Sequence, residues 1–91
     1  MYEIIPTSKF RKSLRKIKRS DKFDVLEIKR IVKIIASGKK LDSRFKEHKL
    51  HGKLSNFREC HIKADLLLLY KKDRKNLILV LVDIGRHDNL F

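Results

Sequence analysis

The chain has 91 residues, and its 24 Lys and Arg outnumber its 11 Asp and Glu, which gives a formal net charge of +13. A chain of this length forms one domain that buries roughly 60–65% of its unfolded surface, which excludes a deep cofactor pocket. Hydrophobic residues make up 42%, so the composition is globular rather than disordered, and the excess positive charge favours polyanionic partners, chiefly nucleic acid.

Three features of the sequence concern the compartment. No run of about 18 apolar residues is present to span a membrane. Residues 1–6 lack the basic region and the long apolar stretch of a signal peptide. The single cysteine, Cys60, cannot form an internal disulfide, which fits a reducing environment. We therefore expect a cytoplasmic protein with no membrane partner.

The N-terminal third predicts a strand followed by a helix. Residues 2–5 are mostly apolar, and Pro6 ends the run, which indicates a short strand and a turn. Thr7 or Ser8 can cap the helix that follows. Its apolar stripe has helical spacing: Phe10, Leu14 and Ile17. The rest of its surface is rich in Lys and Arg, which is either a solvated face or a surface that attracts polyanions.

A second helix is predicted after a break at Ser20 and Asp21, which can also cap it. Gly38 provides its C-terminal stop. Its apolar residues again recur at helical spacing: Val25, Ile28, Val32 and Ile35. The two helices should form an antiparallel hairpin whose apolar side covers a sheet.

Residues 39–56 have scattered apolar residues without a period and are predicted to form a long loop, a feature that is often functional. A strand follows over residues 57–62, with Cys60 and Ile62 on one face and Glu59 and His61 on the other.

Residues 66–71 and 77–82 are apolar runs typical of central strands, joined by a polar hairpin. Gly85 is expected to end the last strand, and a short tail follows. We therefore predict a single α+β domain over residues 1–91, with an N-terminal strand, a helical hairpin and a three-stranded antiparallel meander, and the helices packed on one sheet.

Four histidines supply groups that exchange protons near neutral pH: His48, His51, His61 and His87. In a meander the end of the last strand can lie beside the start of an earlier one. His61, Asp65 and His87 are therefore expected to converge at one edge of the sheet.

Other kinds of site fit the sequence less well. His48 and His51 with His61 and Asp65 could hold a metal, but their spacing matches no common zinc pattern. Cys60 faces away from His61, so a buried packing role is expected rather than a nucleophile. No glycine-rich phosphate loop and no Gly-x-Ser-x-Gly elbow is present.

Histidines on a strongly cationic protein favour RNA cleavage. RNA carries its own nucleophile, the 2′-hydroxyl group. The protein has to remove that proton, protonate the leaving 5′-oxygen and stabilise the phosphorane with cations. Histidine, Lys and Arg supply these functions, so this chemistry requires no metal or other cofactor.

Three stretches resemble the YafQ-type toxins of the RelE/ParE superfamily. They are residues 45–53 (FKEHKLHGK), residues 57–70 (FRECHIKADLLLLY) and residues 85–91 (GRHDNLF). The resemblance covers the length and the element order of the whole chain. It implies a RelE-like fold and a small ribosome-dependent endoribonuclease, the toxin of a type II toxin–antitoxin pair, which cuts mRNA in the ribosome and is neutralised by an acidic antitoxin.

The resemblance also implies which residues act. In the family pattern, activity depends on the positions of five residues: His48, His61, Asp65, His87 and Phe91. His61 and His87 would exchange protons with His48 assisting, Asp65 would orient a histidine or hold a proton, and Phe91 would lie against a base. We expect further cations to hold the substrate: Arg86, Arg58, Lys49 and Lys53.

One departure from the family pattern concerns phosphate binding. Asp83 stands where the family usually has an arginine that would contact the scissile phosphate, and it would repel that phosphate if it lay in the site. Arg86 is a candidate replacement. The alternative is therefore a weak or inactive RelE/ParE-fold module that binds an antitoxin and nucleic acid. A gyrase-directed toxin of the ParE kind is a third option, although that branch does not need these histidines.

Overall fold

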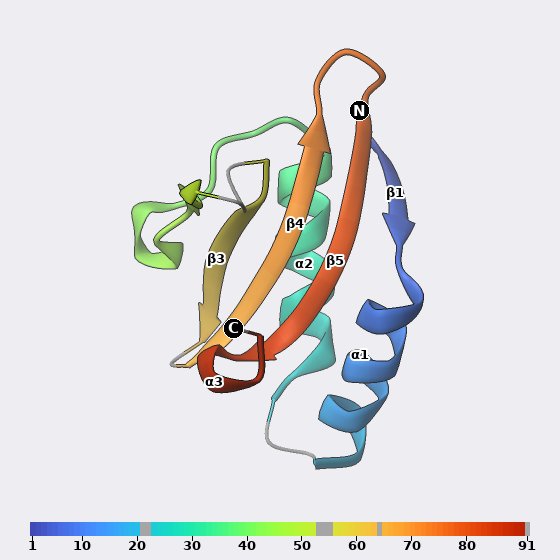
Figure 1. The fold of residues 1–91 in the computed structure, drawn as a ribbon, viewed down its shortest axis with the longest axis vertical. Helices are drawn as coiled ribbons and strands as arrows, with labels where there is room; N and C mark the ends of the chain where they lie inside the picture. Colours follow the sequence, from blue (N-terminus) through green and yellow to red (C-terminus); the bar gives the residue numbers. More distant parts are fainter. Residues whose placement is uncertain (21–22, 53–55, 64, 91) are drawn as a thin grey trace.

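The computed structural model describes residues 1–20, 23–52, 56–63 and 65–90, and their elements follow one another as strand, two helices and a set of strands (Figure 1). The bounds are β1 (Glu3–Pro6), α1 (Ser8–Ser20), α2 (Val25–Ala36), the 3-10 helix η1 (Ser43–Phe45), β2 (His48–Lys49), β3 (Arg58–Lys63), β4 (Leu66–Asp73), β5 (Ile78–Arg86) and α3 (His87–Leu90). The predicted α+β class is confirmed.

The five strands form one mixed sheet in the order β1-β5-β4-β3-β2. β1 runs parallel to β5, and the other neighbouring pairs are antiparallel. The predicted meander is therefore β3, β4 and β5, and the N-terminal strand joins its outer side. A bulge in β5 at Val82 shifts the register, because Tyr70 pairs with Leu81 whereas Leu69 pairs with Asp83.

Two helices cover one side of the sheet, with α2 behind the strands and α1 against β5 (Figure 1). The cap of α1 is Thr7, whose hydroxyl accepts a hydrogen bond from the Phe10 amide at 3.1 Å. The cap of α2 is Asp24, which accepts from the Leu26 amide, rather than the predicted Ser20 or Asp21. No helix in the described ranges is long and apolar enough to cross a membrane.

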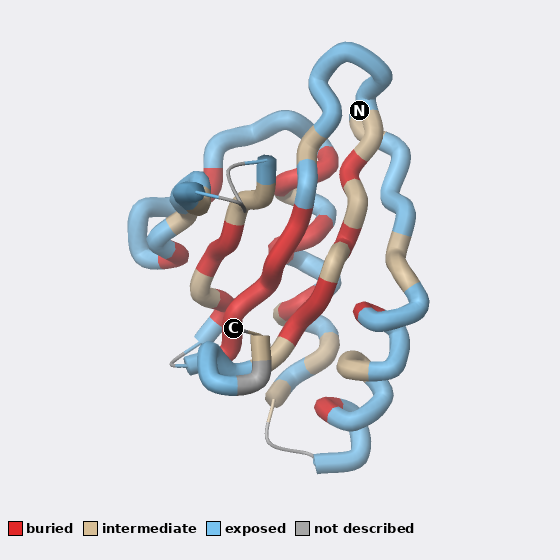
Figure 2. The backbone as a smooth tube through the Cα atoms, in the orientation of Figure 1, coloured by how far each residue is buried: buried red, intermediate tan, exposed pale blue. Residues whose placement is uncertain are grey.

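The core lies between the helices and the sheet, and the buried residues lie in β3, in the first five residues of β4 and at intervals along β5 (Figure 2). Alternate residues of β4 point into it: Leu66, Leu68 and Tyr70. Leu67 and Leu69 are buried on the opposite face, which we call the open face because α1 and α2 do not cover it. Cys60 and Ile62 point into the core, as predicted.

Three boundaries differ from the sequence-based prediction. The expected loop over residues 39–56 contains η1 and β2. The two residues of β2 pair with β3. Leu77 was expected to begin the last strand, but its φ of 55° places it in the turn before β5. Gly85 does not end β5, which runs on to Arg86, and the expected tail forms α3.

Candidate active site

His48 is placed on the open face by the short pairing of β2 with β3. It lies opposite Glu59 in register, and its Nε2 is 2.9 Å from Glu59 Oε1. Its Nδ1 lies 2.9 Å from the Lys46 carbonyl oxygen. Lys46 has a left-handed conformation (φ 47°) at the end of η1, and this turn brings its carbonyl oxygen to Nδ1 of the ring.

The two contacts of His48 hold its ring in place. A carbonyl oxygen only accepts, so Nδ1 is the donor to Lys46, and Nε2 faces the Glu59 carboxyl group. His48 is about half exposed, whereas the Glu59 side chain is only 8% exposed. The ring is therefore fixed at the edge of a buried carboxyl group.

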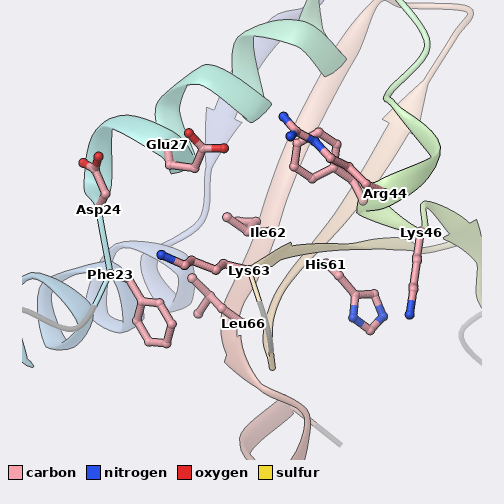
Figure 3. A pocket seen from close by; sticks show the side chains of 10 residues that line it. Phe23, Asp24, Glu27, Arg44, Lys46, His61, Ile62, Lys63 and Leu66 are labelled. Atoms are coloured by element: carbon pink, nitrogen blue, oxygen red, sulfur yellow. The ribbon is translucent and has the colours of Figure 1, made fainter.

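His61 lies on the same face, with its ring centroid 6.4 Å from that of His48. Among the described residues, none makes a hydrogen bond to the His61 ring. It borders an open hollow of about 480 Å³ between β3, η1 and the start of α2, whose lining includes Phe23, Arg44 and Phe45. In Figure 3 the His61 ring and the Lys46 side chain lie on one side of this hollow, and Asp24 and Glu27 lie on the other.

His87 begins α3 at the same end of the sheet as His61. In register, His61 lies opposite Leu67, and Leu67 lies opposite Gly85, two residues before His87. From the end of β5, α3 turns back toward β4 in the view of Figure 1. Strand register therefore places His61 and His87 at the same end of the sheet.

Asp65 pairs with Arg86 at this end, with Oδ2 of the carboxylate 3.2 Å from Nε of the guanidinium. Both side chains are about half exposed. Asp65 therefore contacts a cation, whereas it was expected to contact a histidine. Arg86, the candidate phosphate ligand, is within the region of the histidines but is engaged by a carboxylate.

Asp83 is turned toward α1. Its Oδ1 accepts from the Ser13 hydroxyl at 2.6 Å, its Oδ2 is 3.6 Å from Lys9 Nζ, and the residue is 3% exposed. The concern that Asp83 would repel a phosphate is therefore answered by its contacts, since its charge faces a hydroxyl and a lysine of α1.

The structure does not bring the other predicted substrate cations to the histidines. Arg58 pairs in register with Tyr70, which points into the core, and Lys49 pairs with Arg58. Alternation along the strands places both cations on the helix-bearing face, opposite His61. Lys53 and Phe91 lie outside the described residues.

Two neighbours of His48 were not assigned by sequence reasoning. Glu59 had a signal, because alternation placed it on the face of His61. No sequence signal marked Glu47. Its role depends on a hydrogen bond that it accepts from the hydroxyl of Tyr70, and Tyr70 is 23 residues away. Burial and this contact with Glu47 raise the pKa of Tyr70. The Tyr70–Glu47 bond fastens the segment that carries His48 to the central strand.

Cys60 is inert, as expected. It is fully buried, and burial, with a smaller contribution from Glu47 and Glu59, raises the pKa of its thiol to about 12. A thiol in this state is not a nucleophile near neutral pH.

The donors expected for a metal site do not assemble. Within the described parts of the chain, no three His, Cys, Asp or Glu side chains come together to hold an ion. His48 and Glu59 instead face one another across a hydrogen bond.

The sequence matches one family over nearly all of its length. The profile of the bacterial toxin YafQ, of the type II toxin–antitoxin system, matches residues 2–91. This chain belongs to the YafQ toxin family. No curated protein sequence matches it.

Solved toxin structures share the fold of this YafQ-family chain. A metal-bound toxin from Helicobacter pylori is 40% identical, with 100% of both chains covered and a TM-score of 0.89. A copper-bound mutant toxin from the same organism is 32% identical, with the same coverage and a TM-score of 0.93. The Escherichia coli DinJ–YafQ complex is 24% identical over 100% of this chain and 99% of the other, with a TM-score of 0.85, which shows the fold alone.

Proposed function

We propose that this YafQ-family toxin is an endoribonuclease that cleaves mRNA on the ribosome by acid/base catalysis. The observation that carries the proposal is the pair of His48 and His61, whose ring centroids are 6.4 Å apart on the open face. His61 can exchange a proton with a ribose–phosphate unit bound there, and His48 lies beside it to assist. The position of His87 at the same end of the sheet supports a third participant.

The chemistry needs no external nucleophile. One imidazole removes the proton of the 2′-hydroxyl, whose oxygen attacks phosphorus, and another protonates the departing 5′-oxygen. The products are a 2′,3′-cyclic phosphate and a free 5′-hydroxyl. His61 and His87 share the base and acid roles, because both ring nitrogens of His48 are occupied by Lys46 and Glu59. His48 assists from beside His61, where Lys46 and Glu59 hold its ring.

The surroundings of His61 support nucleotide binding. The hollow beside it offers the aromatic ring of Phe23 and the guanidinium of Arg44, which lies over the buried Phe45 ring at 4.7 Å from its centroid. Aromatic and guanidinium planes are the surfaces on which unstacked RNA bases pack. Arg86 lies at this end of the sheet. It can release the carboxylate of Asp65 and bind a phosphate of the RNA instead.

An acidic antitoxin is the proposed protein partner. The net charge of +13 favours an acidic chain, and a neighbour of the same fold is a DinJ–YafQ complex. The proposed site of action is the cytoplasm, where ribosomes and mRNA are found.

Mapping mRNA ends in bacteria that express the protein tests this function. New ends with a 2′,3′-cyclic phosphate should appear with the natural sequence and disappear with His61→Ala and with His87→Ala. Ends that persist unchanged in both variants would overturn the acid/base assignment.

A non-catalytic binding module is the second candidate. It is favoured by the absence of an arginine at position 83 and by the engagement of Arg86 with Asp65. It predicts tight antitoxin binding with no new mRNA ends, so the same mapping experiment separates the two functions.

A further inference from the structure

A second cationic surface lies at the other end of the sheet, beside the β4–β5 hairpin and away from α3 (Figure 1). It is a hollow of about 330 Å³, which we call the cationic hollow, lined by Lys49, Asn56, Arg58, Lys72 and Arg74. Four of these described lining residues are cations and none is an acid.

The cationic hollow lies on the face of the sheet opposite the histidines. Tyr70 points into the core, and Lys72 follows it by two residues on the same strand. Arg58 pairs with Tyr70, and Lys49 pairs with Arg58, so their side chains share that face. His61 is on the other face and about 10 Å further along β3. One extended strand bound at His61 would have to pass around the edge of the sheet to reach the hollow.

The positive charge of the hollow is only partly compensated. Glu47 is the carboxylate beside it, 3.7 Å from Arg58 Nε, and it also accepts from the Tyr70 hydroxyl. Burial lowers the pKa of Lys72, the charge of Glu47 opposes this as the next largest effect, and the positive charges of Arg74 and Arg58 lower the pKa by smaller amounts. The cations of the hollow therefore repel one another, and a bound anion would relieve that repulsion.

We propose that the cationic hollow binds backbone phosphates of folded RNA, at a site separate from the one where the histidines act. Phosphate contacts come from Lys, Arg and Asn, the residue types that line the hollow. The centre of a peptide interface is instead apolar and depleted in Lys. The proposal rests on the proposed function only in taking ribosomal RNA as the natural source of these phosphates.

The test measures binding rather than cleavage. The double variant Lys72→Ala/Arg74→Ala removes two cations of the hollow and leaves the His48 and Glu47 contacts in place. Lys12→Ala/Arg15→Ala is the matched control, since it removes the same charge from exposed positions of α1.

Affinity for a short RNA hairpin is measured against salt concentration for both variants and the natural sequence, and polyglutamate serves as the acidic-peptide probe. Circular dichroism establishes that each variant is folded, and Lys72→Gln/Arg74→Gln repeats the test with longer side chains.

The expected result is a loss of hairpin affinity of roughly tenfold or more at about 0.1 M salt for the hollow variant, with a salt slope lower by about 2. The control variant should keep the natural slope. Equal slopes for the two variants, or a loss confined to polyglutamate, would overturn the proposal. Because the readout is binding, a protein that cleaves no RNA would still give a decisive result, so this test and that of the proposed function fail independently.

Discussion

His48 Nε2 and Glu59 Oε1 are 2.9 Å apart, and the other ring nitrogen of His48 faces the Lys46 carbonyl. This arrangement fixes the His48 ring against a buried carboxyl group at the edge of the proposed site. Glu59 Oε2 is itself buried and has no hydrogen-bond partner among the described atoms. A buried acceptor without a partner costs about 1–3 kcal/mol of folding free energy, which is consistent with a carboxyl group kept for function rather than for stability.

Glu59→Gln should lower RNA cleavage by at least about tenfold, because an amide holds the His48 ring less firmly than the carboxyl group 2.9 Å from Nε2 does. Cleavage rates at saturating substrate are the measurement. Glu27→Gln is the control, since that exposed carboxylate pairs with Arg30 on α2. Equal rates for the two variants would contradict the role of Glu59.

Asp83→Ala should destabilise the fold by about 1–3 kcal/mol, because the buried carboxylate accepts from Ser13 and the partner hydroxyl is left unpaired. Denaturant unfolding measures the change. Cleavage by the folded fraction should be unaffected, since Asp83 faces α1. Asp83→Arg should likewise fail to raise activity, and a faster enzyme from that substitution would show that position 83 contacts the substrate.

Tyr70 should resist ionisation in the folded protein. Its pKa is raised by burial and by the hydrogen bond to Glu47, so the folded state retains the phenolic proton above about pH 10, where an unfolded tyrosine loses it. The unfolded state then binds fewer protons, and stability is expected to fall as pH rises above about 10. An ultraviolet titration tests this, and Tyr70→Phe should flatten the loss of stability. Tyrosinate absorbance from two tyrosines with ordinary pKa values would contradict it.

Cys60 should react slowly with thiol reagents while the protein is folded. A pKa of about 12, against an ordinary thiol value of 9.0, lowers the thiolate fraction near pH 8 by about a thousandfold. Labelling rates with and without denaturant give the comparison. Rapid labelling of the folded protein would mean that the core opens at β3.

The regular elements could be predicted because their signals are local. The apolar periods gave α1, α2 and the strands β3, β4 and β5. The two-residue strand β2 was missed, because it exists only through its pairing with β3. The tail was expected to be irregular but forms α3.

The site was partly predictable for the same reason. Alternation along β3 placed Glu59 beside His61 and turned Cys60 into the core. The bond between Tyr70 and Glu47 joins residues 23 apart, and no local pattern specifies it. The same alternation gives the face of Arg58, two residues before Cys60, whereas the face of Lys49 follows from the pairing of β2 with β3, which the sequence does not reveal.

Cleavage of mRNA on translating ribosomes tests the central claim most directly, with purified natural protein, His61→Ala, His87→Ala and His51→Ala. His51 is an exposed histidine outside the proposed catalytic set and serves as the matched control. The account predicts that the natural protein and His51→Ala cut the message, whereas His61→Ala and His87→Ala are slower by about 10²–10⁴-fold. Equal cleavage by all four proteins, or none by the natural sequence, would contradict it.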